Sequence, residues 1–260
     1  AFMDGNPRYI STRIGFGEGL VQAGEKDSNV VALCADLTES IQMQDFKNKF
    51  GNRFIEVGVA EQNLVTVASG MARAGKITFA ASYASFSPGR NWEQIRTTIC
   101  LNNMPVRLVG SHAGLTVGPD GATHQMLEDI AMMRALPNMI VLSPGDAIEA
   151  KKATIAMANL NKPSYVRLYR DKTTIFSTNE SPFEIGKAYV LRSGTDVTLF
   201  GTGIMTVELL SAAKILDSNG INVEVVHIPT IKPLDEKTIL SSIEKTGRAI
   251  TAEEAQIAGG

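Results

Sequence analysis

The sequence has only two cysteines among its 260 residues, and Cys34 and Cys100 form no CxxC pair. Both lie in apolar runs, so we expect buried free thiols in a reducing compartment. No apolar run is long enough to span a membrane, and the first residues lack the charged-then-apolar pattern of a signal peptide. We therefore expect a soluble, cytoplasmic protein with no membrane partner.

The sequence also lacks an excess of basic residues. It has 25 Lys and Arg against 27 Asp and Glu, a net charge of −2, and the basic residues are scattered. Binding to a phosphate backbone needs a basic excess or a basic stripe, so a nucleic-acid partner is not expected. Apolar residues make up 44% of the chain, which is ample for a core, and the length allows one large or two modest domains.

Strand-like and helix-like segments alternate through the first two thirds of the chain. The continuous apolar run from Val30 to Cys34 is typical of a strand buried on both faces of a parallel sheet. The expected strands are 30–34, 54–58, 77–81, 105–110, 139–142 and 164–168, and the expected helices are 10–24, 60–74, 88–101, 124–135 and 146–159. This alternation predicts an α/β fold with a doubly wound, mostly parallel sheet. Gly24 is a plausible helix C-cap, and Pro88 is a suitable first-turn residue.

A polar stretch at 173–182 predicts a linker. A second, smaller α/β unit follows, with strands expected near 187–192, 196–201, 222–227 and 248–252 and helices near 204–217 and 235–244. The sequence ends at Gly259-Gly260, shortly after the last expected strand. Because Gly-Gly in this position usually introduces another helix, we expect the second domain to be truncated.

Glu61 is expected in the first turn of the helix 60–74, directly after a strand. In that position a carboxylate faces unpaired backbone N–H groups and the positive end of the helix dipole, which favour its charged form. An acidic residue in a first helical turn is common and is usually only structural.

The richest polar stretch runs from Gly110 to Asp129 and contains His112, His124 and, between them, Asp120. Its glycines make it a loop that can approach a ligand closely. The simplest interpretation is an exposed polar connection. The histidine spacing matches no usual metal-ligand pattern, so no metal site is predicted. Acid–base chemistry fits better, because His124 precedes an expected helix and a helix N-terminus lowers the pKa of a histidine.

Two other segments directly follow expected strands. The first is the polar turn 35–40, which contains Asp36 and Leu37 and lies where open α/β sheets bind ligands. The second contains Tyr83 and Phe86, which are spaced to form an apolar slot for a flat ring. Two aromatics at this spacing are more often core residues than cofactor contacts.

Taken in order, these segments resemble the C-terminal half of transketolase. The matching words are Asp36-Leu37-Thr38-x-Ser40, Gly58-Val59-Ala60-Glu61-Gln62-Asn63, Tyr83-x-x-Phe86, His112, Gly118-x-Asp120-Gly121-x-Thr123-His124-Gln125 and Pro163-Ser164-x-x-x-Leu168-x-Arg170. The resemblance covers nearly the whole chain, and the AEQN and GxDGxTHQ words are specific. It implies a pyrimidine-binding domain at 8–178 and the family's C-terminal domain, truncated, at 184–260.

The resemblance also implies a cofactor, thiamine diphosphate. In this family a glutamate hydrogen-bonds a ring nitrogen of the aminopyrimidine and promotes loss of the thiazolium proton. That role falls to Glu61, while Tyr83 and Phe86 are expected to flank the pyrimidine. The turn that contains Asp36 and Leu37 is expected to contribute to the same site.

Substrate contacts follow from the same resemblance. It implies that His124 acts near the carbonyl and hydroxyl groups of the sugar and that Asp120 contacts a C2 hydroxyl. The positions that match residues holding the sugar's terminal phosphate are Arg13, Ser40, His112 and Arg170. Guanidinium groups suit such a phosphate, although each of these residues alone would be interpreted as surface charge.

One family motif is absent. The diphosphate- and metal-binding sequence Gly-Asp-Gly, followed downstream by Asn, is not present. The resemblance therefore implies that a separate N-terminal subunit supplies the diphosphate and Mg²⁺ sites. We expect a hetero-oligomer with two copies of each subunit.

The resulting hypothesis is a subunit of a split transketolase, which moves a two-carbon ketol unit between phosphorylated sugars. A 1-deoxy-xylulose-5-phosphate synthase-like enzyme is the close alternative, but the 36–40 turn and His112 favour transketolase. The β subunit of a 2-oxo-acid dehydrogenase is a weaker alternative, because that family lacks the GxDGxTHQ loop. A non-catalytic assembly subunit is the alternative from another class, and the retained Glu61, Asp120 and His124 argue against it.

Overall fold

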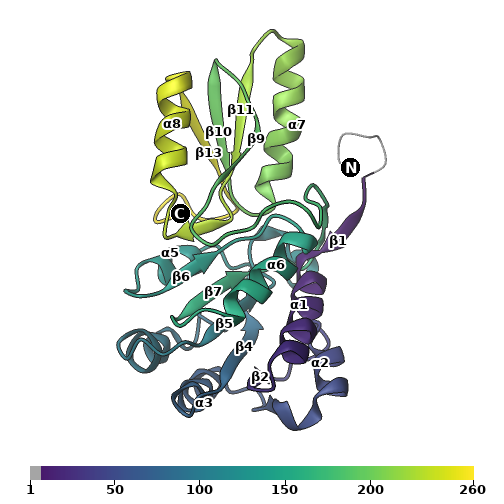
Figure 1. Cartoon of the computed structure of the whole chain (residues 1–260), viewed down its shortest axis with the longest axis vertical. Coiled ribbons are helices and arrows are strands. Elements are labelled where there is room, and N and C mark those ends of the chain that lie inside the picture. Colours follow the sequence, from purple (N-terminus) through teal and green to yellow (C-terminus); the bar gives the residue numbers. More distant parts are fainter. Residues whose placement is uncertain (1–6) are drawn as a thin grey trace.

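A computed structural model describes residues 7–260 and is drawn in Figure 1. Its largest sheet has seven strands in the order β12-β6-β7-β5-β4-β2-β3. Neighbouring strands are parallel except β12, which pairs antiparallel with β6. The strands are β2 (Val30–Cys34), β3 (Phe54–Glu56), β4 (Ile77–Tyr83), β5 (Arg107–Ser111), β6 (Ile140–Leu142), β7 (Ser164–Arg167) and β12 (Thr230–Lys232).

Helices cover both faces of this sheet. On one face lie α1 (Thr12–Lys26) and α6 (Ala147–Ala158), and on the other lie α3 (Glu61–Arg73) and the π-helix η2 (Ile95–Cys100). β2 serves both cores, because Ala32 and Cys34 face the first and Val31 and Leu33 face the second. The prediction of a doubly wound, mostly parallel sheet is confirmed. The shorter helices are α2 (Gln44–Lys49), η1 (Gly51–Arg53), α4 (Trp92–Gln94), η3 (Leu115–Asp120) and α5 (Asp129–Arg134).

Two expected helix boundaries are wrong, the end of the helix predicted at 10–24 and the start of the helix predicted at 88–101. α1 continues past Gly24 to Lys26, and a Cβ atom at Gly24 would lie 2.7 Å from the Phe46 ring, so this glycine serves close packing and is not a cap. Residues 84–91 form turns, and helix begins only at Trp92. Pro88 therefore lies in a turn.

A tertiary contact explains the late start at Trp92. The Asn91 Nδ2 atom donates to the carbonyl oxygen of Glu61 at 2.8 Å and to Ser87 Oγ at 3.1 Å. The turn 84–91 is thereby tied to the beginning of α3.

The helix expected at 124–135 is also shorter than predicted. α5 begins at Asp129, and His124 lies in a turn before it. The carbonyl of Met126 accepts the Gly114 N–H at 2.8 Å, and the carbonyl of Leu127 accepts the Gln256 N–H at 3.0 Å. Because these carbonyls have partners outside the segment, they do not take part in a continuous helix. No helix N-terminus therefore acts on His124.

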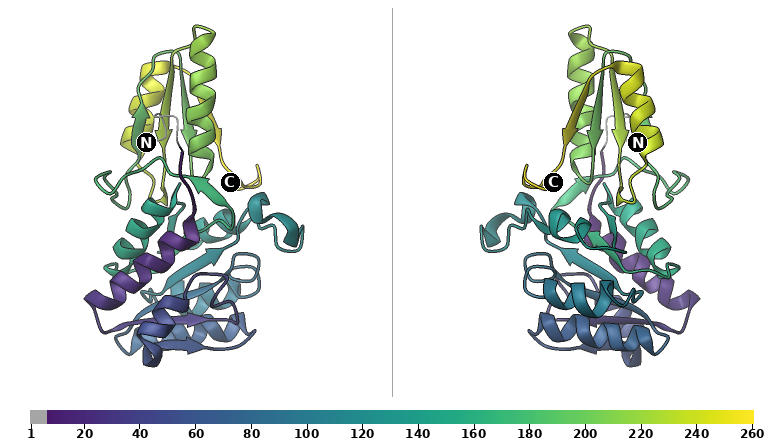
Figure 2. Two further views of the ribbon diagram at one scale, coloured as in Figure 1. Left: turned by 90° about the vertical axis from the view of Figure 1, so that its right-hand side faces the viewer. Right: turned by 90° about the vertical axis from the view of Figure 1, so that its left-hand side faces the viewer.

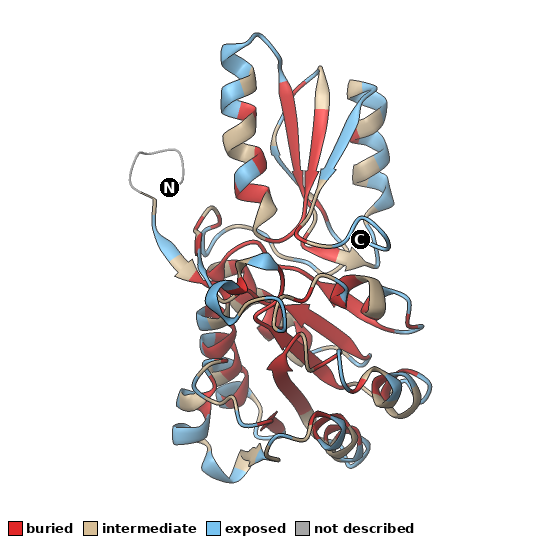
Figure 3. Ribbon diagram, turned by 180° about the vertical axis from the view of Figure 1, so that it is seen from behind, coloured by how far each residue is buried: buried red, intermediate tan, exposed pale blue. Residues whose placement is uncertain are grey.

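The smaller unit has a sheet of its own, in the order β13-β10-β11-β9. β10 (Val197–Gly201), β11 (Val223–His227) and β13 (Ala249–Ala252) are parallel, and β9 (Tyr189–Arg192) is antiparallel to β11. α7 (Met205–Ser218) and α8 (Glu236–Thr246) cover opposite faces of this sheet. Figure 3 shows that the central strands of both units are buried while the outer helix surfaces are exposed. The expected second α/β unit is confirmed.

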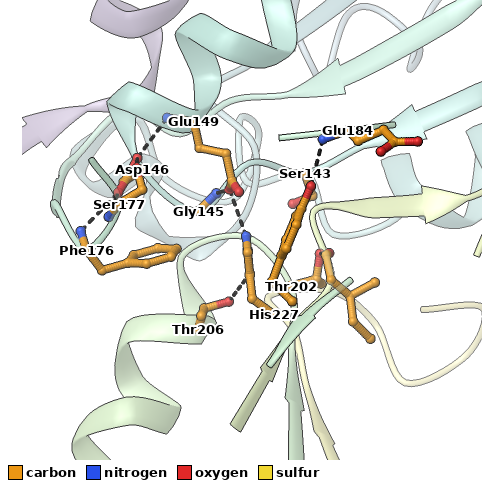
Figure 4. A network of polar contacts seen from close by, with 12 residues as sticks. Ser143, Gly145, Asp146, Glu149, Phe176, Ser177, Glu184, Thr202, Thr206 and His227 are labelled. Atoms are coloured by element: carbon orange, nitrogen blue, oxygen red, sulfur yellow. Dashed lines mark hydrogen bonds and ion pairs between the residues drawn. The ribbon is translucent and has the colours of Figure 1, made fainter. Parts of the chain in front are cut away.

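The two units are stacked one above the other (Figure 2) and share a polar junction. His227 Nε2 on β11 lies 2.7 Å from Glu149 Oε2 on α6, and both side chains are buried. Thr206 Oγ1 lies 2.6 Å from His227 Nδ1, and the Gly145 N–H donates to the same Glu149 oxygen (Figure 4). β12 adds a backbone connection, because it pairs with β6 of the first sheet.

The segment expected as a linker is partly ordered into the fold. Its first two residues belong to β8 (Lys172–Thr174), which pairs antiparallel with β1 (Tyr9–Ser11). Further along, the Ser177 N–H and hydroxyl both bond to the buried Asp146 carboxylate (Figure 4). The linker predicted at 173–182 therefore begins only after β8, and part of it is hydrogen-bonded to the first unit. None of the helices in residues 7–260 is long and apolar enough to cross a membrane.

Candidate active site

Glu61 is the first residue of α3, as the sequence predicts, and only 5% of its surface is exposed. Its carboxylate caps no backbone N–H of the helix. Instead, Arg90 Nη1 lies 3.2 Å from both carboxylate oxygens. A half-exposed guanidinium, rather than the helix terminus, therefore holds this buried acid in place.

A row of stacked groups leads away from Glu61. The Arg90 guanidinium lies 4.1 Å from the centre of the Phe86 ring. Phe86 and Tyr83 are nearly parallel, with centroids 5.8 Å apart, and Tyr83 stacks on His112 at 3.8 Å. We call Glu61, Arg90, Phe86, Tyr83, His112 and Arg13 the stacked row. It joins residues from α3, the turn 84–91, β4, the end of β5 and α1.

The space between Tyr83 and Phe86 is narrower than a slot for a third ring. Aromatic surfaces pack about 3.5–4 Å apart, so a ring between two others would need a separation of about 7 Å or more. The centroids are 5.8 Å apart. No gap for a flat ligand therefore lies between these two rings, and their outer faces are covered by Arg90 and His112, so only the ring edges remain.

His112 is 2% exposed and lies at a positive φ of 56° directly after β5. Ser111 Oγ is 2.9 Å from its Nδ1, and Arg13 Nη1 is 3.5 Å from its Nε2. Burial and, to a smaller extent, the charges of Arg13, Arg170 and His124 together lower the pKa of His112 to about 3. The imidazole is therefore neutral, and the interpretation of His112 as an exposed loop residue is wrong.

Arg13 and Arg170 both lie near enough to this imidazole to lower its pKa, and both are hydrogen-bonded to neutral groups. Arg13 Nη1 donates to the Ser40 carbonyl at 2.6 Å, and Arg170 Nη1 donates to the Val117 carbonyl at 2.9 Å. Burial lowers the pKa of Arg13, and the repulsion of Arg170 lowers it further. The structure thus brings together the residues for which the sequence predicts a common anion site.

The glycine-rich loop places its two remaining candidates differently. His124 meets Phe86 edge-on at 5.3 Å and Tyr83 at 6.0 Å, so it lies against the stacked row. Its Nδ1 is 2.9 Å from Thr123 Oγ1. Asp120 is exposed at the end of η3. His124 is thus in ring contact with the row, whereas Asp120 is open to solvent.

Asp36 and Leu37 lie at the carboxyl end of β2, next to β4 and β3. Leu37 packs against the apolar cluster that contains Tyr83, while Asp36 is exposed at a φ of 59°. Glu56 holds this turn, since its carboxylate accepts the Asp36 N–H at 2.7 Å and the Thr38 hydroxyl at 3.2 Å.

No local motif indicates that Arg90 pairs with Glu61, because the two residues are 29 positions apart. Glu56 had a usable signal, because it ends an expected strand beside a polar turn that needs hydrogen-bond acceptors.

An open pocket of about 490 Å³ adjoins the acid end of the row and is lined by Val59, Ala60, Glu61, Gln62, Asn63 and Arg90. A larger pocket of about 790 Å³ lies in the second unit, between β9 and α8, and no residue of the stacked row lines it. We place the site at the smaller pocket, because the buried Glu61 carboxylate lines it together with Arg90, whose guanidinium stacks on Phe86. Within residues 7–260, no group of three His, Cys, Asp or Glu side chains could hold a metal ion.

The sequence matches two known domain families. Residues 8–174 match the transketolase pyrimidine-binding domain, and residues 186–260 match the transketolase C-terminal domain. A transketolase C-terminal section from Methanocaldococcus jannaschii is 45% identical over 97% of this chain and 79% of its own length. The 6-deoxy-6-sulfo-D-fructose transketolase subunit SqwH from a Clostridium species is 39% identical over 93% of this chain and 75% of its own length.

A solved structure described as a split-gene transketolase, an inactive β4 tetramer, superposes with a TM-score of 0.90. It is 41% identical and is matched over 96% of this chain and 82% of its own. The fold and these matches therefore define an α/β protein with a transketolase pyrimidine-binding domain and a transketolase C-terminal domain. The chain belongs to the transketolase family.

Proposed function

We propose that this chain is the pyrimidine-binding subunit of a split transketolase, which transfers a two-carbon ketol unit between phosphorylated ketose and aldose sugars. The observation that carries this proposal is the stacked row itself. It has a buried carboxylate at one end and a cluster of positive groups at the other, with His124 against its middle. A cofactor-activating acid, an acid–base group and a phosphate site are the parts that such a reaction needs.

The residues of the acid end fit thiamine diphosphate. Glu61 is a buried carboxylate that lines a pocket, and Arg90 connects it to the ring of Phe86, which stacks on Tyr83. When bound there, the cofactor would supply the nucleophilic carbon for ketol transfer. Glu61 would hold or release a proton at its carboxyl oxygen, which requires a group that can be both acid and base. The turn with Asp36 and Leu37 would help to close the cofactor side of the site.

The residues of the basic end fit a sugar phosphate. Arg13, Arg170 and the neutral His112 would bind the terminal phosphate together with the Ser40 turn, since charge-assisted hydrogen bonds to a dianion are strong. Asp120 and His124 would contact the hydroxyls and the carbonyl oxygen. One relative is named for 6-deoxy-6-sulfo-D-fructose, so a sugar sulfonate is a second candidate anion for the basic end.

We further propose that a separate N-terminal subunit supplies the diphosphate and Mg²⁺ sites, in a cytoplasmic hetero-oligomer of two copies of each subunit. The absent Gly-Asp-Gly motif supports this, as does the relative described as a C-terminal section. The solved relative described as an inactive β4 tetramer also agrees with a chain that needs a partner. Cys34 and Cys100 are buried free thiols, as suits a reducing compartment.

The test is reconstitution with the cognate N-terminal subunit. We expect ketol transfer between phosphorylated sugars in the presence of thiamine diphosphate and Mg²⁺, and none from either subunit alone. Calorimetric titration of the isolated chain with cofactor and Mg²⁺ should show only weak binding. Micromolar binding without the partner would contradict the division of the site, and an inactive complex with bound cofactor would contradict the proposed reaction.

A further inference from the structure

The segment after β13 in the second unit reaches into the glycine-rich loop of the first. Glu254 is 9% exposed, and its Oε1 accepts the Thr116 N–H at 2.7 Å while its Oε2 lies 3.2 Å from Thr116 Oγ1. A Cβ atom at Gly114, which has a φ of 81°, would lie 2.3 Å from the Glu254 carboxyl carbon. The carboxylate is therefore inserted tightly at the start of this loop.

The same segment also holds the other end of the loop. The Gln256 N–H donates to the Leu127 carbonyl at 3.0 Å. Arg167 Nη2 donates to the Met126 carbonyl at 3.2 Å and to the Glu254 carbonyl at 2.7 Å, so one fully buried guanidinium joins the loop to the second unit.

Arg167 is also bound to a residue of the first unit, Asp129. Its Nε lies 3.2 Å from the Asp129 carboxylate, which also accepts the Tyr165 hydroxyl at 2.7 Å. All three side chains are fully buried, and the partners of the guanidinium come from the loop, α5 and the second unit. Arg167 therefore links the loop to both units. We call Glu254, Gln256 and Arg167 the clamp.

Between the two clamped ends lie Asp120 and His124. Asp120 is exposed and His124 is only partly buried, so the backbone of 114–127 largely sets where their side chains lie. Among residues 7–260, two other side chains from outside the loop bond to that backbone: Arg170 donates to the Val117 carbonyl at 2.9 Å, and the neighbouring Glu128 accepts the Leu127 N–H at 3.0 Å.

We propose that Glu254 is a positioning residue, through which the second domain sets the geometry of Asp120 and His124 toward the substrate. This proposal rests on the proposed function of the site. It gives the second domain a role in the reaction, although none of the residues proposed to touch cofactor or sugar belongs to that domain.

The first measurement needs no activity. Hydrogen exchange of the whole chain, followed by mass spectrometry, reports the protection of 114–127 in wild type, in Glu254→Ala and in the near-isosteric Glu254→Gln. Loss of a charge-assisted bond should speed exchange at Thr116 by about 10- to 150-fold in Glu254→Ala, and less in Glu254→Gln, which keeps one acceptor oxygen. Glu253→Ala is the matched control, because Glu253 accepts no hydrogen bond from the loop.

The second measurement uses the reconstituted complex. In the Glu254 variants kcat/KM for sugar phosphates should fall by about 10- to 100-fold, the scale of a small displacement of substrate-contacting groups. Exchange of the cofactor C2 proton should be unchanged, because Glu61 lies on α3 and not on the loop. A general loss of folding would slow both steps together.

The outcomes separate the two proposals. Faster loop exchange with lower kcat/KM and an unchanged C2 exchange supports the clamp. Unchanged loop exchange, or faster exchange with unaltered sugar kinetics, overturns it. A wild-type complex that binds cofactor but transfers no ketol unit counts against the proposed function alone, and it is recognised before any variant is compared.

Discussion

The two ends of the stacked row balance their charge in different ways. At the acid end the Glu61 carboxylate is already paired within the chain, with Arg90. At the basic end Arg13 and Arg170 are hydrogen-bonded to neutral carbonyls. The positive charge of Arg170 lowers the pKa of Arg13 more than the negative charge of Asp171 raises it. A ligand that binds Glu61 at the acid end must therefore displace Arg90, whereas an anion at the basic end gives the two arginines a charged partner that they lack. This difference supports our proposal that the cofactor binds at the acid end and an anion at the basic end.

Removing the acid should have the largest effect. In Glu61→Gln, we expect exchange of the cofactor C2 proton to slow by at least ~10²-fold, because glutamine can hydrogen-bond but cannot exchange the proton. Deuterium exchange at C2, read by NMR after acid quench of the reconstituted complex, measures this step. Glu93→Gln is the matched control, since Glu93 is also a first-turn carboxylate, in α4. An unchanged exchange rate in an assembled Glu61→Gln complex would reduce Glu61 to a structural role.

Removing a cation from the basic end should have the next largest effect. In Arg170→Ala, we expect the KM for phosphorylated sugars to rise by roughly 30- to 150-fold, from about 2–3 kcal/mol lost with a charge-assisted contact. Steady-state kinetics with a phosphorylated sugar, its sulfonate analogue and an unphosphorylated sugar test this. Lys172→Ala, an exposed neighbour in β8, is the control. Equal losses for charged and uncharged sugars would mean that Arg170 acts only through its bond to Val117.

Removing the internal partner of Glu61 should change cofactor binding only modestly. The Arg90 side chain is 51% exposed, and such ion pairs contribute about 0.2–1 kcal/mol. If Arg90 competes with the cofactor for Glu61 and Phe86, Arg90→Ala should tighten cofactor binding by up to about 5-fold. Calorimetry on the complex measures the change, and Arg96→Ala, at an exposed arginine of η2, is the control. Weaker binding would instead make Arg90 part of the cofactor site.

The sequence could predict the elements whose pattern is local. The apolar run of β2 and the start of α3 at Glu61 follow from residue periodicity, and both are as expected. The helix after His124 could not be predicted correctly, because the carbonyls of Met126 and Leu127 are taken by donors far away in the sequence.

The residues of the site also divide into those that a local motif identifies and those that depend on long-range contacts. The resemblance identified His112, but its burial and its stack on Tyr83 depend on the tertiary fold. Arg90 and Glu254 escaped notice, because each acts on a residue far away in the sequence and neither belongs to a local motif.

The smallest expected effect is on stability at the basic end. Burial and the neighbouring Arg13, Arg170 and His124 charges lower the pKa of folded His112 to about 3. Between the ordinary histidine value of about 6.5 and this lower value, the unfolded chain therefore binds more protons than the folded one.

Stability from His112 is thus fully present above about pH 6.5 and is lost as the pH falls toward 3. From pH 7 to 5, the wild-type Tm should fall further than that of His112→Asn, by about 2–4 °C for each kcal/mol in a chain of this size. Inorganic phosphate should reduce this difference, because an anion between the cations favours the charged imidazole. Thermal unfolding of both proteins at each pH, with and without phosphate, measures the effect. If phosphate leaves the difference in Tm between wild type and His112→Asn unchanged, burial alone keeps His112 neutral. The basic end would then not be an anion-binding site.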